Sequence, residues 1–100
     1  MDYIPRPGIV CVPLCGRRVL VPTRQASEYC SSVFTLTGLG LMVWTAIEHD
    51  YPMEQLLDLY GIFTKLDQAG KIRKIEDSCQ KLLELGFIMR KPEAADKDNI

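Results

Sequence analysis

The pattern of hydrophobic and polar residues predicts three short strands at the start of the chain. Residues 8–14 and 18–22 are rich in β-branched and aliphatic side chains, and the Cys-Gly-Arg sequence of residues 15–17 is expected to form a turn between them. Residues 23–31 are polar and predict a loop. Residues 32–36 then predict a third strand, so the first third of the chain is expected to form an antiparallel sheet.

Three helices are predicted to follow these strands. Residues 38–49 are apolar around most of a helix circumference and are expected to lie buried, and the hydroxyl of Thr37 is expected to cap this helix. Residues 52–60 repeat apolar side chains at helical spacing, and residues 71–85 carry a narrow apolar stripe that ends at Gly86. The fold class is therefore predicted as α+β, winged-helix-like, with a three-stranded antiparallel sheet followed by three helices.

The remaining segments set the expected domain limits. Residues 1–8 contain two prolines and are expected to be an N-terminal arm, followed by one domain over residues 9–90. Within this domain, residues 62–70 fit a short helical turn and a loop, and residues 87–90 fit a short strand or an extended segment packed on the core. Residues 91–100 are polar and are expected to be disordered.

Composition and charge narrow the function classes. A chain of 100 residues with 47% hydrophobic content is expected to form one domain with one core. No apolar run reaches the roughly 18–20 residues that cross a bilayer, and the start of the chain does not resemble a signal peptide, so a cytoplasmic protein without a membrane partner is expected. The net charge of −1 is uneven: residues 32–70 hold five acids and one lysine, whereas residues 71–91 hold six bases and three acids.

The residues that carry chemistry give no catalytic pattern. The four cysteines, at positions 11, 15, 30 and 79, form no Cys-x-x-Cys pair, and His49 is the only histidine. Buried thiols are favoured over a metal site or a disulfide, which stay open alternatives. Since there is also no glycine-rich phosphate loop and no Ser/His/Asp set, neither an enzyme activity nor a cofactor is expected.

Two motifs stand out along the chain: Phe34-Thr35-Leu36-Thr37-x-x-Gly40-x-x-Val43-Trp44-x-x-Ile47 and Ile75-x-x-x-Cys79-x-x-Leu82-x-x-x-Gly86-Phe87-Ile88. They resemble segments of the PqqD-like proteins, named for protein D of pyrroloquinoline quinone biosynthesis. That family has an aromatic residue before Leu-Asn, then a glycine and an Ile-Trp pair, and it ends with a leucine four residues before Gly-Leu-Leu. The resemblance spans roughly residues 9–89, and Thr37 here replaces the common asparagine, Lys74 a frequent aspartate and Ser78-Cys79 a bulky apolar pair.

The resemblance implies a recognition element for ribosomally synthesised and post-translationally modified peptides. Such a domain binds the leader region of a precursor peptide as an added strand beside its third strand, against its third helix. The implied partners are the leader peptide and a peptide-modifying enzyme, such as a radical-SAM enzyme or a leader peptidase. The domain itself performs no chemistry.

Eleven residues are the expected peptide-binding set. The third strand is expected to offer its edge, the third helix an apolar floor at Ile75 and Leu82, and its lysines a flank that favours acidic leader residues. The small Ser78 is expected to leave a pocket for a bulky leader side chain. The set is Ser32, Val33, Phe34, Thr35 and Leu36 on the strand, with Lys71, Lys74, Ile75, Ser78, Lys81 and Leu82 on the helix.

Other interpretations remain open on the sequence alone. Apolar residues at regular spacing, such as Phe34, Leu36, Ile75 and Leu82, more often belong simply to the core. A winged helix that binds DNA through the third helix is an alternative, although a pI of about 5.8 does not favour a nucleic-acid partner. A structural subunit of an enzyme complex is another, and the third-strand edge also allows a homodimer.

Overall fold

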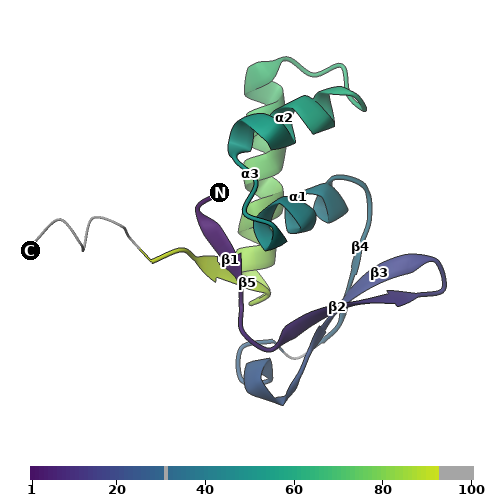
Figure 1. Ribbon diagram of the computed structural model, residues 1–100, viewed down its shortest axis with the longest axis vertical. Helices are drawn as coiled ribbons and strands as arrows, with labels where there is room; N and C mark the ends of the chain where they lie inside the picture. Colours follow the sequence, from purple (N-terminus) through teal and green to yellow (C-terminus); the bar gives the residue numbers. More distant parts are fainter. Residues whose placement is uncertain (31, 93–100) are drawn as a thin grey trace, which may run out of the picture.

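Three antiparallel strands form the larger of two sheets. The computed structural model, which describes residues 1–30 and 32–92, contains β2 (Ile9–Leu14), β3 (Arg17–Pro22) and β4 (Phe34–Leu36) in the order β2-β3-β4 (Figure 1). Strand β4 is therefore an edge strand, and it is two residues shorter at its start than predicted. With the three helices that follow, this architecture confirms the predicted α+β, winged-helix-like class.

The helices are α1 (Gly38–Glu48), α2 (Met53–Gly61) and α3 (Gln68–Glu84), and a short 3₁₀ helix, η1 (Arg24–Ala26), lies in the predicted loop. Helix α3 begins three residues before the predicted position. The reason is Asp67, whose carboxylate accepts a hydrogen bond of 2.8 Å from the backbone N–H of Gly70 and so caps the first turn.

The prediction that the Thr37 hydroxyl caps α1 is wrong. Thr37 is extended and its side chain makes no capping bond, whereas its carbonyl accepts a 3.0 Å hydrogen bond from the N–H of Gly40. Gly38 turns the chain through a left-handed conformation with a φ of 51°, and the helix thus starts without a side-chain cap. The Thr37 hydroxyl is consequently left free of the helix.

A second sheet joins the two ends of the described chain. Strand β1 (Tyr3–Pro5) pairs antiparallel with β5 (Ile88–Arg90), with Tyr3 opposite Arg90. The sequence offered a strand over residues 87–90 as one alternative, but it did not predict β1, which lies in the expected arm. Figure 1 shows this small sheet beside the lower end of α3, separate from the β2–β3 hairpin.

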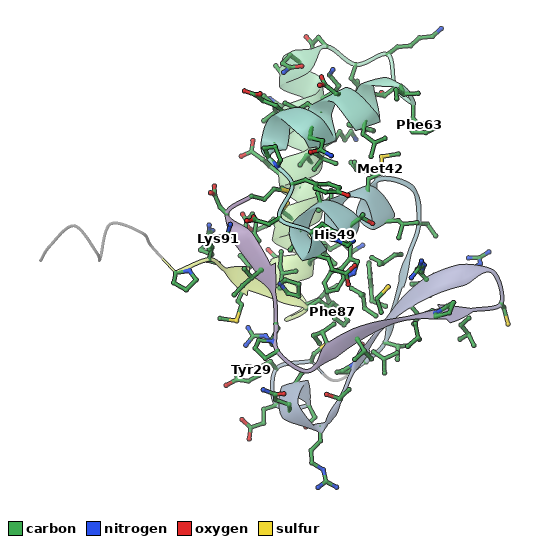
Figure 2. The ribbon with its side chains drawn as sticks, viewed as in Figure 1. Tyr29, Met42, His49, Phe63, Phe87 and Lys91 are labelled. Carbon is green, nitrogen blue, oxygen red and sulfur yellow. The ribbon has the colours of Figure 1, made fainter. Side chains whose placement is uncertain are left out.

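The segment after β5 remains attached to the domain as far as Lys91. Its backbone N–H donates to the carbonyl of Asp2 at 2.8 Å, and its ammonium lies 2.7 Å from the carboxylate of Asp50 (Lys91 is labelled in Figure 2). The amino terminus of Met1 lies 3.2 Å from the same carboxylate. Disorder was predicted from residue 91 onward, and residues 93–100 lie outside the described chain.

The core lies where α1 and α3 meet the inner face of the larger sheet. Trp44 of α1 and Phe87, which follows α3, are its largest fully buried side chains, and Leu20 of β3 completes the contact with the sheet. Their burial agrees with the all-round apolar pattern of residues 38–49. Among the described helices, none combines the length and apolar character needed to cross a membrane.

Candidate functional site

The free edge of β4 lies opposite α3, and a hollow separates them. Strand β4 pairs with β3 through Phe34, Thr35 and Leu36, which lie opposite Leu20, Val19 and Arg18. Within residues 1–30 and 32–92, no strand pairs with its other edge. Backbone groups on that edge are therefore available to another extended chain.

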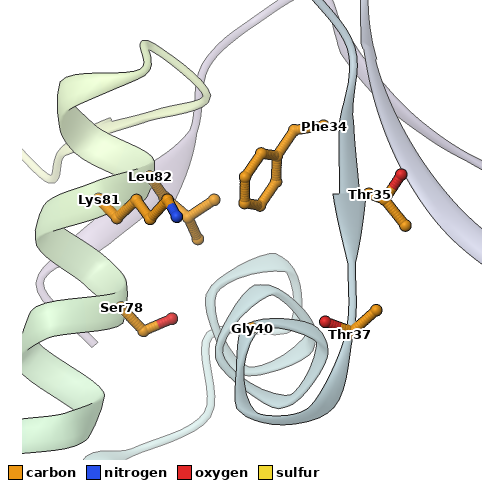
Figure 3. Close-up of a pocket in the computed structure, with 7 residues that line it drawn as sticks. All are labelled: Phe34, Thr35, Thr37, Gly40, Ser78, Lys81 and Leu82. Carbon is orange, nitrogen blue, oxygen red and sulfur yellow. The ribbon is translucent and has the colours of Figure 1, made fainter.

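The hollow has a volume of about 180 Å³. A buried cavity of about 150 Å³ accommodates benzene, so this hollow is large enough for one bulky side chain. Figure 3 shows its lining, which comes from β4, from the start of α1 and from the C-terminal half of α3: Phe34, Thr35, Thr37, Gly40, Ser78, Lys81 and Leu82.

The inner part of the hollow is apolar. The ring of Phe34 extends from β4 towards α3 (Figure 3), and its centroid lies 5.7 Å from that of Phe87, with the two rings tilted by 40°. Leu82 is only 2% exposed and forms the floor beside it. A hydrophobic side chain that entered here would thus exchange water for aromatic and aliphatic contacts.

The outer part is polar and carries a cation. The ammonium of Lys81 lies 5.6 Å from the centroid of the Phe34 ring, within the range of a cation–π interaction. The hydroxyls of Thr37 and Ser78 lie at the opening, whereas the side chain of Thr35 points to the other side of β4 (Figure 3). The hollow therefore combines an apolar interior with a rim of hydrogen-bonding groups and one positive charge.

The structure brings together five of the eleven residues expected from the sequence: Phe34, Thr35, Ser78, Lys81 and Leu82. Sequence reasoning missed Thr37 and Gly40 as lining residues. Both were noted as part of the motif that starts the first helix, and they reach the hollow because β4 leads directly into α1. A β-carbon at Gly40 would have no neighbour within 4 Å, so this position leaves the hollow open.

Four of the other expected residues lie elsewhere. Leu36 and Ile75 are 2% and 0% exposed and belong to the core cluster, where the alternative core interpretation had placed them. Ser32 and Val33 are exposed and precede the strand. Ser32 and Val33 therefore present backbone hydrogen-bonding groups beside the hollow, and their side chains do not pack in it.

The two remaining lysines also lie outside the hollow. The ammonium of Lys71 would lie 3.2 Å from a β-carbon at Gly61, which places it at the C-terminal end of α2, where a cation is favourable. Lys74 lines a separate, shallow hollow at the start of α3 together with Leu66 and Arg73. Of the three expected lysines, only Lys81 faces the β4 edge.

The loop that leads to β4 is fastened to the end of α3. The Nε–H of Arg6 donates to the carbonyl of Gly86 at 2.8 Å, and its guanidinium lies 4.1 Å from the ring centroid of Tyr29 (labelled in Figure 2). Gly86 has a φ of 88°, and a β-carbon there would clash with the carbonyl oxygen of Tyr29. These contacts join the loop before β4 to the residue that follows the C-terminal end of α3.

All four cysteines are free, and burial raises the pKa of the Cys79 thiol to about 11, so this thiol is protonated at neutral pH. No three His, Cys, Asp or Glu side chains in the described ranges are grouped as metal ligands would be. The site itself consists of the free edge of β4, the hollow and the positive charge of Lys81, which together suit contacts with an extended chain.

The fold is similar to that of a solved complex described as TbiB1 in complex with the TbiA(beta) leader peptide. The two chains superpose with a TM-score of 0.70 at 16% sequence identity, over 90% of this chain and 99% of that chain. No protein-family model matches the chain, and no curated protein matches its sequence. At this identity the likeness concerns the fold, and it confirms at that level the resemblance to leader-binding domains found in the sequence.

Proposed function

We propose, from the fold shared with a leader-peptide complex, that this chain is a non-catalytic adaptor for a ribosomally synthesised precursor peptide. It binds the leader region of the precursor and delivers it to a peptide-modifying enzyme. The observation that carries the proposal is the side-by-side arrangement of an unpaired strand edge and a hollow of about 180 Å³. This combination provides what strand addition needs: backbone groups to pair with, and a pocket that selects side chains.

In this proposal the leader adds as a fourth strand to the free edge of β4. Alternate side chains of an added strand point to the same face, so every second leader residue faces α3. One bulky apolar side chain enters the hollow and contacts Phe34 and Leu82. Lys81 at the rim pairs with an acidic leader residue nearby, and the hydroxyl of Ser78 leaves space for the inserted side chain.

Affinity and selectivity then have different sources. Backbone hydrogen bonds along β4 contribute affinity for any extended peptide, whereas the hollow and Lys81 discriminate between sequences. The chain accelerates modification by tethering, because a bound precursor is presented at a raised effective concentration to an enzyme, such as a radical-SAM enzyme or a leader peptidase, that binds the same adaptor.

The test is an amide NMR titration with the synthetic leader half of a precursor peptide encoded beside this protein. We expect saturable binding, with the largest shift changes in residues 32–37 and 78–82. A scrambled peptide of identical composition is the control and should bind more weakly. Saturable binding whose shift changes lie away from β4 would refute the strand-addition site.

Two other functions are outcomes of the same experiment. Binding of random duplex DNA that weakens steeply with salt, without leader binding, would favour the winged-helix DNA-binding alternative. Tight binding to the enzyme that is unaffected by precursor would favour a structural subunit. Either result would replace the adaptor proposal.

A further inference from the structure

The β2–β3 hairpin has a second apolar surface that the core does not use. In the register of the sheet, Cys11 lies opposite Leu20, and Leu20 opposite Phe34, and all three pack on the core. Side chains alternate along each strand, so the intervening residues point to the opposite face. We call this the outer sheet face, and it consists of Val10, Val12, Leu14, Val19 and Val21.

The outer sheet face is open to solvent at the β2 residues Val10 and Leu14, whereas Val19 of β3 is buried, at 6% exposed. None of its five residues belongs to the core cluster or packs against it. Val10 is 41% and Leu14 is 59% exposed, and Figure 1 shows the hairpin extending well away from the three helices. A contiguous aliphatic surface of this kind on a small domain is a mark of an interaction site.

The charge around this face defines its partner. Residues 8–25 contain three arginines and no acidic residue. Arg17 lies opposite Leu14 at the tip of the hairpin, and Arg24 follows the other end of β3. Within residues 1–30 and 32–92, neither arginine forms an ion pair. A complementary partner therefore presents an aliphatic centre with a rim of carboxylates.

The size of the face favours a transient protein contact over a stable dimer. Strands about 4.8 Å apart, with a rise of about 3.4 Å per residue, give the two six-residue strands of the hairpin a surface of roughly 10 by 20 Å. That is about 200 Å², well below the roughly 800 Å² that each partner buries in a standard interface. The face also has no aromatic residue, whereas surfaces that insert into membrane interfaces are rich in tryptophan and phenylalanine.

We propose that the outer sheet face docks the adaptor on the enzyme that acts on the bound precursor, through an apolar enzyme surface with a carboxylate rim. The inference rests on the proposed function, because it assigns the enzyme partner of that adaptor to a surface. Phe34, which reaches into the hollow, lies opposite Leu20 on the inner face of the sheet, so the apolar part of the hollow and the outer sheet face are on opposite sides of the sheet. Leader and enzyme therefore bind together, as delivery requires.

The test compares two charge-introducing variants that differ in location. The double variant Val10→Glu with Leu14→Glu places carboxylates on the outer sheet face, where they meet the acidic rim of the enzyme. Ile62→Glu is the matched control, because Ile62 is an apolar residue that is 73% exposed at the end of α2, outside the hairpin. Far-ultraviolet circular dichroism and thermal melting establish that all three proteins are folded.

Two dissociation constants are measured for each protein: one for the fluorescent leader peptide, and one for the immobilised enzyme whose modification of the precursor the adaptor accelerates. We expect the outer-face variant to bind the enzyme at least about tenfold more weakly, and Ile62→Glu to bind it as the wild type does. Leader affinity should be unchanged in both. A further variant, Arg17→Glu, should weaken enzyme binding and reduce its dependence on salt.

Unchanged enzyme affinity in the folded outer-face variant would overturn the docking proposal. The proposal would also be overturned if the wild-type protein sedimented as a dimer and the outer-face variant as a monomer. Binding of phosphatidylserine vesicles through this face, in place of the enzyme, would overturn it as well. Failure of the proposed function has a different signature, because wild-type protein would then not bind the leader peptide at all.

Discussion

Filling the hollow beside β4 should abolish leader selection without damaging the fold. The substitution Ser78→Phe places an aromatic ring at the rim, on a residue that lines the hollow together with Phe34 and Leu82. Serine and phenylalanine have similar intrinsic helix propensities, so α3 itself is little affected. The new ring occupies the space of about 180 Å³ that the proposed leader side chain requires.

The magnitude follows from the burial that the leader loses. Burying one large apolar side chain contributes about 1.5–3 kcal/mol. Because about 1.4 kcal/mol corresponds to a factor of ten in a dissociation constant, Ser78→Phe should weaken leader binding by about 10- to 150-fold. The free energy of unfolding should stay equal or rise slightly, since the introduced ring becomes partly buried against Phe34.

The assay is fluorescence anisotropy with a labelled leader peptide, together with urea denaturation of the variant. Gln80→Phe is the control, because Gln80 is an exposed residue of the same helix whose side-chain amide donates to the carboxylate of Glu84 at 3.1 Å. Leader affinity within about twofold of the wild type in a Ser78→Phe variant of normal stability would refute the pocket. A loss of affinity shared by both variants would refute the assignment of the effect to the hollow.

Three further predictions concern the framework around the site. Gly86→Ala should lower the free energy of unfolding by at least about 2 kcal/mol, measured by urea denaturation, because its φ is positive and the added carbon meets the carbonyl of Tyr29. Iodoacetamide at pH 8 should alkylate the exposed Cys15 and spare the buried Cys79, whose raised pKa of about 11 keeps it protonated, and equal labelling by mass spectrometry would contradict this. Hydrogen bonds from the ammonium of Lys91 and then from the amino terminus lower the pKa of Asp50 in the folded protein. The stability that this carboxylate contributes is therefore complete above its unfolded pKa and is lost as the pH falls through its folded pKa. Asp50→Asn should thus destabilise the protein at pH 7 and have little effect at pH 2.

The parts of the fold that repeat a pattern could be predicted from the sequence. The apolar stripe of residues 71–85 and the all-round apolar character of residues 38–49 gave helices close to the observed ones, because burial of such patterns is a local requirement. Strand β1 could not be predicted in the same way. Its three residues include Pro5 and become a strand only because Ile88 and its neighbours, more than eighty residues later, provide the pairing partner.

The candidate site was likewise only partly predictable from the sequence. The resemblance to the PqqD-like proteins implied that the third strand and the third helix share a groove, and helix spacing put Ser78 and Lys81 on one flank of that helix; in the structure both line the same hollow as Phe34. The position of Lys71 depends on the packing of α2 against α3, which the spacing of residues along α3 does not encode. Likewise, Ile75 shares a helix face with Leu82, but only tertiary packing determines which of them borders the hollow.

The pairing of β1 with β5 has a consequence for how the domain can be joined to other chains. Because the backbone of Lys91 bonds to that of Asp2, the first and last described strands begin and finish at neighbouring points. Domains with adjacent ends tolerate circular permutation and insertion into loops of other proteins. A permutant that links these ends through a short glycine-serine segment would open at the exposed Cys15–Gly16 turn and keep both β4 and α3 in place. The free edge of β4 and the hollow could then be inserted, as one continuous domain, into a surface loop of an enzyme.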